Sequence, residues 1–259
     1  MAGKRVIVVG AGIIGASIAW HLAKAGAEVT VIEADEPGGV ATRNSWAWIN
    51  ASWGNPKAYF RLRMHSIGEW HRLGRELPSL PLKFCGSLTY DMPEAALLEY
   101  VERHGDWGYR IRLVEADEIA RLVPLLRERP RFAAKCDDEG RVEPAEATQL
   151  LLAAAAERGA SINRTARVAR LRVDSGRVTG VDTGDGAITA DEVIVAAGIG
   201  SPQLLASAGI DFPLDSPPGL LAHTAPLPPV LFEATINTGF KPSCSAVMRC
   251  KLPNRAFEE

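Results

Sequence analysis

Three glycines near the N-terminus have the spacing of a loop that binds phosphate groups. The pattern is G-x-G-x-x-G, and its residues are Gly10, Ala11, Gly12, Ile13, Ile14 and Gly15. Residues 5–9 before it form a continuous apolar run, which is typical of a strand buried on both faces. Residues 13–24 after it repeat apolar side chains at helical spacing. A helix that begins there would present free backbone N–H groups and a partial positive charge to a phosphate.

Each glycine of this pattern has a distinct physical role. Gly10 permits the tight turn from strand to helix, Gly12 leaves room for a pyrophosphate beside the backbone, and Gly15 lets the helix pack close to the strand. Glu33 ends the next apolar run, residues 28–33, where a carboxylate can accept hydrogen bonds from an adenosine ribose and disfavours a 2′-phosphate. The sequence therefore predicts a dinucleotide site that disfavours NADP. The alternative is a glycine-rich structural turn beside a solvated glutamate.

Composition narrows the class of protein. The chain has 259 residues, of which 47% are hydrophobic and 23% charged, and its net charge is −2. These values are ordinary for a globular protein, and without a basic excess they give nucleic-acid binding no support. No run reaches the ~18 apolar residues that a membrane-spanning helix needs. Lys4 and Arg5 before an apolar run resemble a signal peptide, but the glycines within that run favour the strand and helix instead.

Cysteine usage indicates a reducing compartment. The four cysteines are Cys85, Cys136, Cys244 and Cys250, and they form no C-x-x-C pair. This spacing predicts neither a metal site nor a disulfide framework, and it favours a cytoplasmic protein.

The segments after Glu33 distinguish two cofactors that share the ADP group. An NAD domain usually continues as alternating helices and parallel strands. Here a Gly38-Gly39 turn leads to a long helix over 58–77, and the next parallel strand is predicted only at 193–196, in the same sheet as residues 6–9. The elements expected in between are strands at 82–91, 110–114, 166–173, 178–183 and 187–189, with a hairpin turn at Asp174-Ser175-Gly176-Arg177, and helices at 94–104, 116–122 and 145–157. This order favours FAD over NAD.

Five segments of the chain resemble one family of enzymes. They are the run Val6–Glu33, the Gly38-Gly39 turn with Thr42-Arg43, the helix at 59–73, the turn Gly140–Pro144 and the strand Val193–Gly198. Together they resemble the FAD-dependent oxidoreductases of the D-amino-acid oxidase, glycine oxidase and sarcosine oxidase type. The resemblance spans residues 4–230.

The resemblance implies an α/β fold. A doubly wound, parallel, Rossmann-like FAD-binding domain would be interleaved with an α+β substrate domain that contains a mixed or antiparallel sheet. The expected boundaries are 1–80 and 145–205 for the FAD domain, and 81–144 and 206–230 for a partial substrate domain. Residues 231–259 are expected to be an atypical tail.

The resemblance also implies which residues contact FAD. Gly10, Gly12 and Gly15, with Ile13 and Ile14 between them, would approach the pyrophosphate, and Glu33 would hold the ribose. Thr42 and Arg43 would lie near the pyrophosphate or the flavin, Val168 would offer backbone groups to the adenine, and Ala197 and Gly198 would pass close to the cofactor. No metal is implied and no catalytic residue is identified. Arg43 is a candidate for contact with substrate or flavin, with a solvated loop arginine as the alternative.

Members of this family oxidise a C–N bond of an amine or amino acid by hydride transfer to the flavin. The resemblance therefore implies a small-molecule amine or amino-acid substrate. A bidentate arginine would suit its carboxylate, and the sequence does not assign one. Trp46, Trp48 and Trp53 are expected in the core or in the wall of the flavin pocket. Two alternatives stay open: a truncated or non-catalytic FAD-binding module, such as a subunit that needs a partner in a larger dehydrogenase, and an NAD-dependent dehydrogenase.

The tail after Val230 departs from the family pattern. Residues 231–259 show no alternation typical of strands and no glycine-rich segment that could cover a flavin ring. We expect a C-terminal truncation or a shifted reading frame, with no strand pair added to the substrate sheet. Because flavin chemistry needs a shielded ring, the chain is expected to be a poor catalyst by itself.

Overall fold

The chain folds into two compact units. The structure, a computed structural model, describes residues 3–51, 55–90, 92–124, 126 and 129–216, and three short strands at 221–223, 235–237 and 247–249. The first unit consists of residues 1–45 and 143–218, and the second of residues 46–142 and 219–259. Among the described residues, no helix is both long enough and apolar enough to cross a bilayer.

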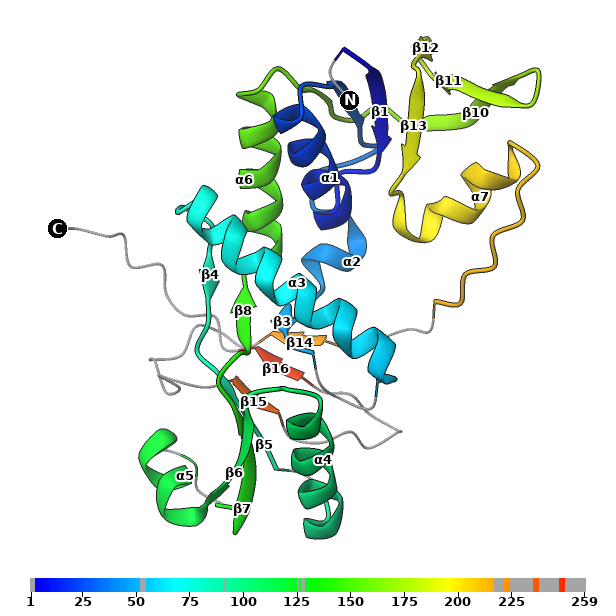
Figure 1. Cartoon of the computed structure of the whole chain (residues 1–259). Coiled ribbons are helices and arrows are strands. Elements are labelled where there is room, and N and C mark those ends of the chain that lie inside the picture. Colours follow the sequence, from blue (N-terminus) through cyan, green and yellow to red (C-terminus); the bar gives the residue numbers. More distant parts are fainter. Residues whose placement is uncertain are drawn as a thin grey trace, which may run out of the picture. The chain divides into compact units, whose positions relative to one another are not determined.

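Figure 1 labels most of the helices and strands. Those of the first unit are β1 (Arg5–Val9), α1 (Ile13–Lys24), β2 (Glu28–Ile32), α2 (Val40–Arg43), α6 (Pro144–Ala156), β9 (Ser161–Asn163), β10 (Val168–Asp174), β11 (Arg177–Thr183), β12 (Gly186–Thr189), β13 (Glu192–Val195), the 3-10 helix η1 (Gly198–Gly200) and α7 (Ser201–Ala206). Those of the second unit are β3 (Trp48–Ile49), α3 (Lys57–Glu76), β4 (Leu82–Lys83), β5 (Ser87–Thr89), α4 (Glu94–Asp106), β6 (Ile111–Glu115), α5 (Ala116–Leu122), β7 (Phe132–Cys136), β8 (Gly140–Val142), β14 (Leu221–His223), β15 (Thr235–Asn237) and β16 (Val247–Arg249).

A parallel sheet of four strands forms the centre of the first unit. Its order is β13-β1-β2-β9, and Ile7 stands between Val193 of β13 and Thr30 of β2. The prediction that residues 6–9 and 193–196 share one sheet is therefore confirmed. Ile7 is 1% exposed because β10, β11 and α7 cover its face of the sheet, where Leu171 and Leu204 pack into the same apolar cluster. This burial stabilises the unit through the hydrophobic effect.

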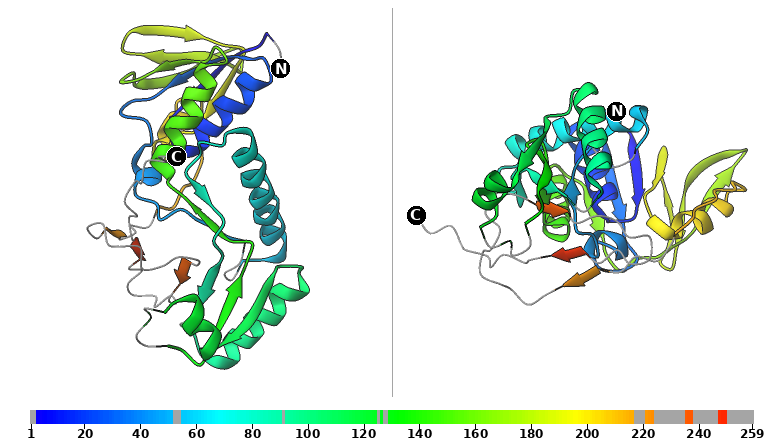
Figure 2. Two further views of the ribbon diagram at one scale, coloured as in Figure 1. Left: turned by 90° about the vertical axis from the view of Figure 1, so that its left-hand side faces the viewer. Right: turned by 90° about the horizontal axis from the view of Figure 1, so that it is seen from below.

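Two helices rich in alanine lie side by side in this unit, α1 and α6 (Figures 1 and 2). Ala16 and Ala19 of α1 and Ala147 and Ala155 of α6 have no exposed surface. Small side chains let two helix backbones approach closely, and each alanine loses little conformational entropy in a helix. The pair therefore forms a closely packed layer over the sheet.

The predicted hairpin at residues 174–177 is confirmed. It joins β10 to β11, and β12 pairs with β11 to complete an antiparallel sheet of three strands. Ser175 and Gly176 at its tip have φ angles of 51° and 78°. Two successive positive φ angles define the type I′ turn, whose twist matches that of the two strands.

The second unit contains two sheets with antiparallel pairing. One has the order β15-β5-β7-β6 and the other the order β3-β8-β4. The strand predicted at 82–91 is in fact two strands, β4 and β5, which belong to different sheets. Gly86 separates them with a φ of 71°, and a Cβ at Gly86 would lie 2.9 Å from the carbonyl oxygen of Cys136.

The unit boundaries differ from the predicted domain boundaries. Residues 46–80, expected in the first domain, belong to the second unit, and residues 206–218, expected in the second domain, belong to the first. Strand pairing explains the first difference, because Trp48 of β3 is the register partner of Arg141 in β8. Aromatic contacts add to it, because the ring of Phe60 on α3 lies 5.3 Å from that of Trp107.

The sequence predicts that residues 231–259 add no strand pair to the substrate sheet, whereas the structure adds one strand from this segment, β15, to the sheet of β5, β7 and β6. β15 pairs in parallel with β5, with Ile236 beside Leu88, and β14 pairs in parallel with β16. Three residues are too few to show an alternating pattern in the sequence. Trp53, Cys244 and Cys250 lie outside the described residues.

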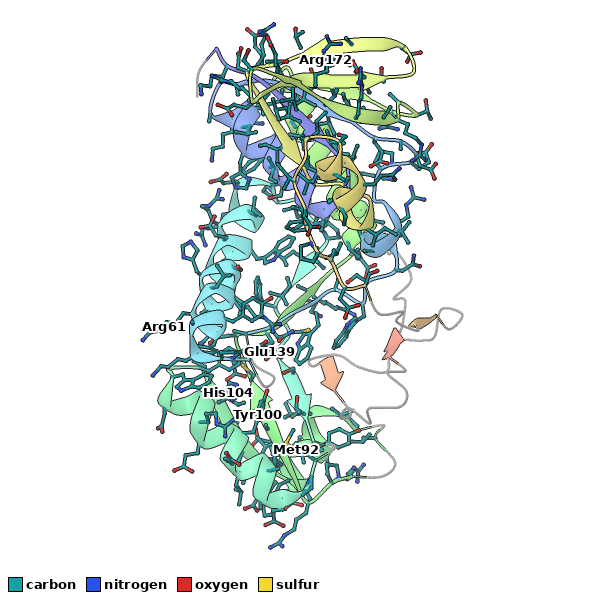
Figure 3. All side chains as sticks on the ribbon, turned by 90° about the vertical axis from the view of Figure 1, so that its right-hand side faces the viewer. Arg61, Met92, Tyr100, His104, Glu139 and Arg172 are labelled. Carbon is teal, nitrogen blue, oxygen red and sulfur yellow. The ribbon has the colours of Figure 1, made fainter. Side chains whose placement is uncertain are left out.

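A buried carboxylate ties the start of the second unit to its sheets. Glu139 is 1% exposed (labelled in Figure 3), and its two oxygens accept hydrogen bonds from Trp48 Nε1 at 2.7 Å and from the Tyr109 hydroxyl at 2.6 Å. The Tyr109 oxygen in turn accepts the backbone N–H of Ala51 at 3.1 Å. Burial and the nearby carboxylate both raise the pKa of Tyr109 far above its ordinary value, so the hydroxyl stays a donor.

We predict that Tyr109→Phe lowers the free energy of unfolding by about 1–3 kcal/mol, because it removes a donor to Glu139 and the acceptor of a buried N–H group. The measurement is urea unfolding followed by circular dichroism. Tyr59→Phe is the control, since Tyr59 is 49% exposed and should change stability by less than about 0.5 kcal/mol. Equal stability of the two variants would contradict a structural role for the network.

Candidate functional site

The carboxyl ends of the parallel strands form the candidate site in the first unit. Numbered in chain order, the four strands β9, β2, β1 and β13 have the order 3-2-1-4. The strand order therefore reverses direction between β1 and β13. In open parallel sheets, ligands bind in the crevice beyond the carboxyl ends of the strands at such a switch point. The glycine pattern begins at this point, directly after Val9.

Two of the three glycines lie where no side chain fits. A Cβ at Gly10 would lie 2.4 Å from the carbonyl oxygen of Ala196, and one at Gly15 would lie 1.9 Å from the carbonyl oxygen of Gly10. Gly10 also has a φ of 104°, a conformation that favours glycine. These two contacts confirm the tight turn and the close packing of helix on strand. The first turn of α1 therefore starts directly against the end of β1.

Gly12 faces Thr42 across a narrow gap. A Cβ at Gly12 would lie 3.2 Å from Thr42 Oγ1, and that oxygen accepts the backbone N–H of Ile13 at 3.1 Å. Thr42 is 9% exposed and belongs to α2, so the second helix supplies a polar cap for the start of α1. Ile14, one residue further on, has 65% of its surface exposed. The first N–H groups of α1 have no carbonyl partner within the helix, so this end of the helix is suited to binding an anion.

Glu33 holds the glycine loop in place. Its Oε2 accepts the backbone N–H of Ala11 at 2.7 Å, and its Oε1 accepts the backbone N–H of Asp35 at 3.0 Å. The backbone of Glu33 continues the sheet, donating to Asn163 and accepting from Ala166. A carboxylate has about four lone-pair positions, so contacts to two N–H groups leave acceptor capacity toward a ribose. The ribose contact itself remains a prediction.

The other predicted contacts have different surroundings. Arg43 donates from Nη2 to the carbonyl oxygen of Pro37 at 2.8 Å and lies against Gly38, so it shapes the turn before α2. Ala197 accepts the N–H of Gly200 and opens η1, and Gly198 follows with a φ of 56°. Ala197 and Gly198 come shortly after β13, at the edge of the parallel sheet that carries the glycine loop.

Val168 begins β10 and lies in the apolar cluster beneath the sheet. Its side chain is 9% exposed and packs with Ile7, Val9 and Ile32. In the antiparallel ladder its register partner is Thr183. The structure therefore assigns the Val168 side chain to the core, and a role of its backbone toward adenine stays a prediction.

Three large apolar side chains near the carboxyl ends of the parallel strands are exposed in the described part of the chain. Ile14 is 65%, Val40 72% and Ile199 68% exposed, and they come from α1, α2 and η1. Large apolar side chains that gather beside a polar backbone cradle commonly mark a ligand site. This combination suits a ligand that has both phosphates and flat rings.

The sequence did not reveal two features of the site. The strand β9, whose Asn163 receives the N–H of Glu33, has a single apolar residue and gives no strand signal. The contact between Thr42 and Ile13 depends on how the chain folds back.

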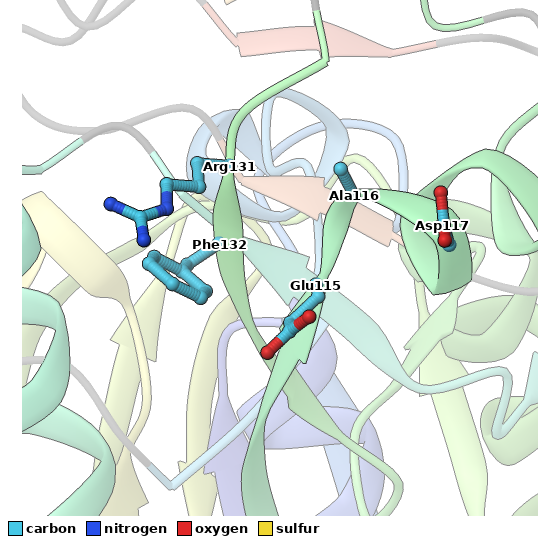
Figure 4. A pocket seen from close by; sticks show the side chains of 5 residues that line it. All are labelled: Glu115, Ala116, Asp117, Arg131 and Phe132. Carbon is cyan, nitrogen blue, oxygen red and sulfur yellow. The ribbon is translucent and has the colours of Figure 1, made fainter.

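In the second unit, a hollow of about 240 Å³ is lined by Glu115, Ala116, Asp117, Arg131 and Phe132 (Figure 4), and none of these residues was predicted to bind a ligand. Among the described residues, no group of three His, Cys, Asp or Glu side chains could hold a metal ion.

The strand order, the glycine loop of residues 10–15 and the carboxylate of Glu33 together define a dinucleotide-binding protein. Residues 5–248 match the family described as FAD dependent oxidoreductase, and the chain belongs to this family. The site fits FAD, because Gly12 begins α1 without a side chain and the N-terminus of this helix can bind the pyrophosphate through its backbone N–H groups.

Curated relatives and solved structures support the same family. The chain is 31% identical to the uncharacterised oxidoreductase YurR of Bacillus subtilis, covering 85% of this chain and 62% of that protein. It is 30% identical to a glycine oxidase of Bacillus licheniformis, covering 79% of this chain and 57% of the relative. Its structure resembles an L-proline dehydrogenase from P. horikoshii with a TM-score of 0.73 and 28% identity, over 81% of this chain and 56% of the other. The chain thus spans less than two thirds of the length of these proteins.

We predict that Gly15→Ala reduces the amount of FAD bound to the purified protein and destabilises it by about 1–3 kcal/mol, because the added Cβ overlaps the Gly10 carbonyl oxygen. The measurement is the ratio of released FAD to protein together with thermal unfolding. Gly68→Ala in α3 is the control, since nothing lies within 4 Å of a Cβ there and alanine favours a helix. Full FAD content in Gly15→Ala would contradict the described packing.

We also predict that Glu33→Ala weakens FAD binding by about 1–3 kcal/mol, the order of a lost hydrogen bond to a charged group. Glu33→Gln should lose less, because it keeps one acceptor oxygen. Calorimetric titration of the FAD-free protein measures both. Glu36→Ala, three residues along the same loop, serves as the control, and an unchanged affinity in Glu33→Ala would show that Glu33 serves the loop alone.

Proposed function

We propose that this FAD-dependent oxidoreductase oxidises the C–N bond of a small amine or amino acid. The observation that carries the proposal is the glycine loop of residues 10–15 at the switch point of the parallel sheet, in a chain that belongs to the FAD dependent oxidoreductase family. Relatives named glycine oxidase, D-amino-acid oxidase and monomeric sarcosine oxidase support the substrate class.

The chain's own residues would bind the cofactor and orient it, and the reaction needs no protein nucleophile. When bound, FAD supplies the acceptor for a hydride taken from the substrate carbon. The backbone of residues 10–15 would hold the pyrophosphate, and Glu33 would fix the adenosine ribose while it keeps the loop closed. Ile14, Val40 and Ile199 would cover apolar parts of the cofactor and exclude water from them.

A cytoplasmic location is part of the proposal and rests on cysteine usage. The alternative left open by the sequence, an FAD-binding module or subunit without its own turnover, concerns the same cofactor site. A partner subunit would be required only in that case. Membership of the FAD family favours FAD over NAD.

The test is an absorption spectrum of the purified chain, followed by turnover assays with amino acids and secondary amines and a dye as electron acceptor. We expect a flavin spectrum, release of FAD on denaturation, and only slow reduction of the dye by an amine or amino acid, because the chain is expected to be a poor catalyst by itself. Bound flavin without turnover across the panel would favour the module. A colourless protein that binds NAD would overturn the proposal.

A further inference from the structure

His104 of the second unit is surrounded by four aromatic rings, the aromatic enclosure. It lies in the last turn of α4 and is 2% exposed. The centre of its ring is 4.5 Å from that of Tyr100 and 5.1 Å from that of Trp107. The other two rings, Phe60 and Tyr109, lie at 6.1 and 6.4 Å. Phe60 comes from α3 and is itself 2% exposed, so His104 is part of the contact between α3 and α4.

The two nitrogens of the His104 ring have different surroundings. Nδ1 lies 2.8 Å from the carbonyl oxygen of Tyr100 (both residues are labelled in Figure 3). A carbonyl oxygen only accepts hydrogen bonds, so the proton of the neutral ring is on Nδ1. Nε2 is buried and has no hydrogen-bond partner among the described residues. The enclosure therefore suits the neutral imidazole, whose Nε2 carries a lone pair and no proton.

Charged groups approach this enclosure from three parts of the second unit. Arg103 precedes His104 on α4, and the Lys57 ammonium on α3 lies 6.0 Å from the centre of the indole of the enclosure. The carboxylate of Glu139 accepts a hydrogen bond at 2.6 Å from the Tyr109 hydroxyl, and neither ring nitrogen of His104 bonds to it. A second proton on His104 would therefore add a third positive charge without an acceptor for its N–H group in the described part of the chain.

The protonation of His104 is linked to the stability of the second unit. Burial lowers the pKa of His104 below its ordinary value, and the charge of Arg103 lowers it further, against the raising effect of the bond to Tyr100. The folded unit therefore binds fewer protons at His104 than the unfolded chain does. The resulting stability is fully present above the ordinary histidine pKa of 6.5, and it is lost as the pH falls from there toward the lowered pKa of the folded state.

We infer that His104 is a pH-sensitive switch in the second unit. As a neutral ring it packs with Phe60 and holds the N-terminal part of α3 on α4. A proton on Nε2 breaks this packing, because burying a charged N–H group without an acceptor is unfavourable. All residues of the enclosure belong to the second unit, so the switch is separate from the glycine loop and the FAD site of the first.

Urea unfolding of the full chain, followed by tryptophan fluorescence from about pH 8 to about pH 5, tests this switch. Five of the six tryptophans fall in the sequence of the second unit and only Trp20 in the first, so the signal reports mainly on the second unit. We expect His104 to raise the unfolding equilibrium constant by up to about tenfold for each pH unit below 6.5. His104→Phe keeps an aromatic ring that cannot be protonated and should lose this part of the pH dependence.

A second variant and a direct measurement keep the test decisive if His104→Phe does not fold. His104→Asn cannot be protonated either, and its amide can donate to the Tyr100 carbonyl as Nδ1 does. NMR of the ¹⁵N-labelled histidine rings in the folded parent should show the His104 proton on Nδ1 and none on Nε2. His65→Asn is the matched control, because His65 is an exposed histidine on α3 of the same unit, and this variant should keep the pH dependence of the parent.

Three results would overturn the inference: the same pH dependence in the parent and in the folded His104 variants, the loss of this dependence in His65→Asn, or a proton on Nε2 of His104 in the folded parent at neutral pH. None of these measurements requires bound FAD or turnover. The outcome is therefore independent of the proposed function.

Discussion

The close approach of α1 to β1 is the constraint on which the candidate site depends. A Cβ at Gly15 would lie 1.9 Å from the carbonyl oxygen of Gly10, so the helix can start where it does only with glycine at this position. That start puts the N-terminal N–H groups of α1 at the switch point between β1 and β13. A phosphate can then be bound by backbone groups and a helix dipole, which carry no side-chain entropy cost.

Contacts from distant parts of the first unit hold this loop. Glu33 at the end of β2 accepts from Ala11, and Thr42 in α2 accepts from Ile13, so two polar side chains fix the two ends of the turn. The alanines of α1 and α6 pack behind it and hold the helix against the sheet. A preorganised loop loses less entropy when it binds a ligand, and this favours affinity without additional contacts.

The sequence predicted those parts of the fold whose signals are local. The strands β1, β2 and β13 are apolar runs, α1 lies between a glycine pattern and Gly26, and the hairpin at Ser175-Gly176 needs two positive φ angles. β7 and β9 were missed because Phe132–Cys136 has no β-branched residue and Ser161–Asn163 has only one apolar side chain. Gly140–Val142, interpreted as a turn, is a strand because both β3 and β4 pair with it.

The candidate site follows the same division. Gly10, Gly15 and Glu33 could be assigned from spacing because their roles come from the backbone geometry of a strand, a helix and the next strand. The bond between Ile13 and Thr42 at this site joins residues 29 positions apart, and in the second unit the pairing of β3 and β4 with β8 depends on strand register. No local sequence pattern encodes these contacts, so only the tertiary structure shows them.

A crystal structure of the chain with FAD bound tests the assignment of the glycine loop most directly. We predict that the pyrophosphate oxygens lie about 3 Å from backbone nitrogens within residues 11–14, and that a ribose hydroxyl lies within the same distance of the Glu33 carboxylate. A pyrophosphate bound away from the N-terminus of α1, or a Glu33 carboxylate that contacts only Ala11 and Asp35, would contradict it.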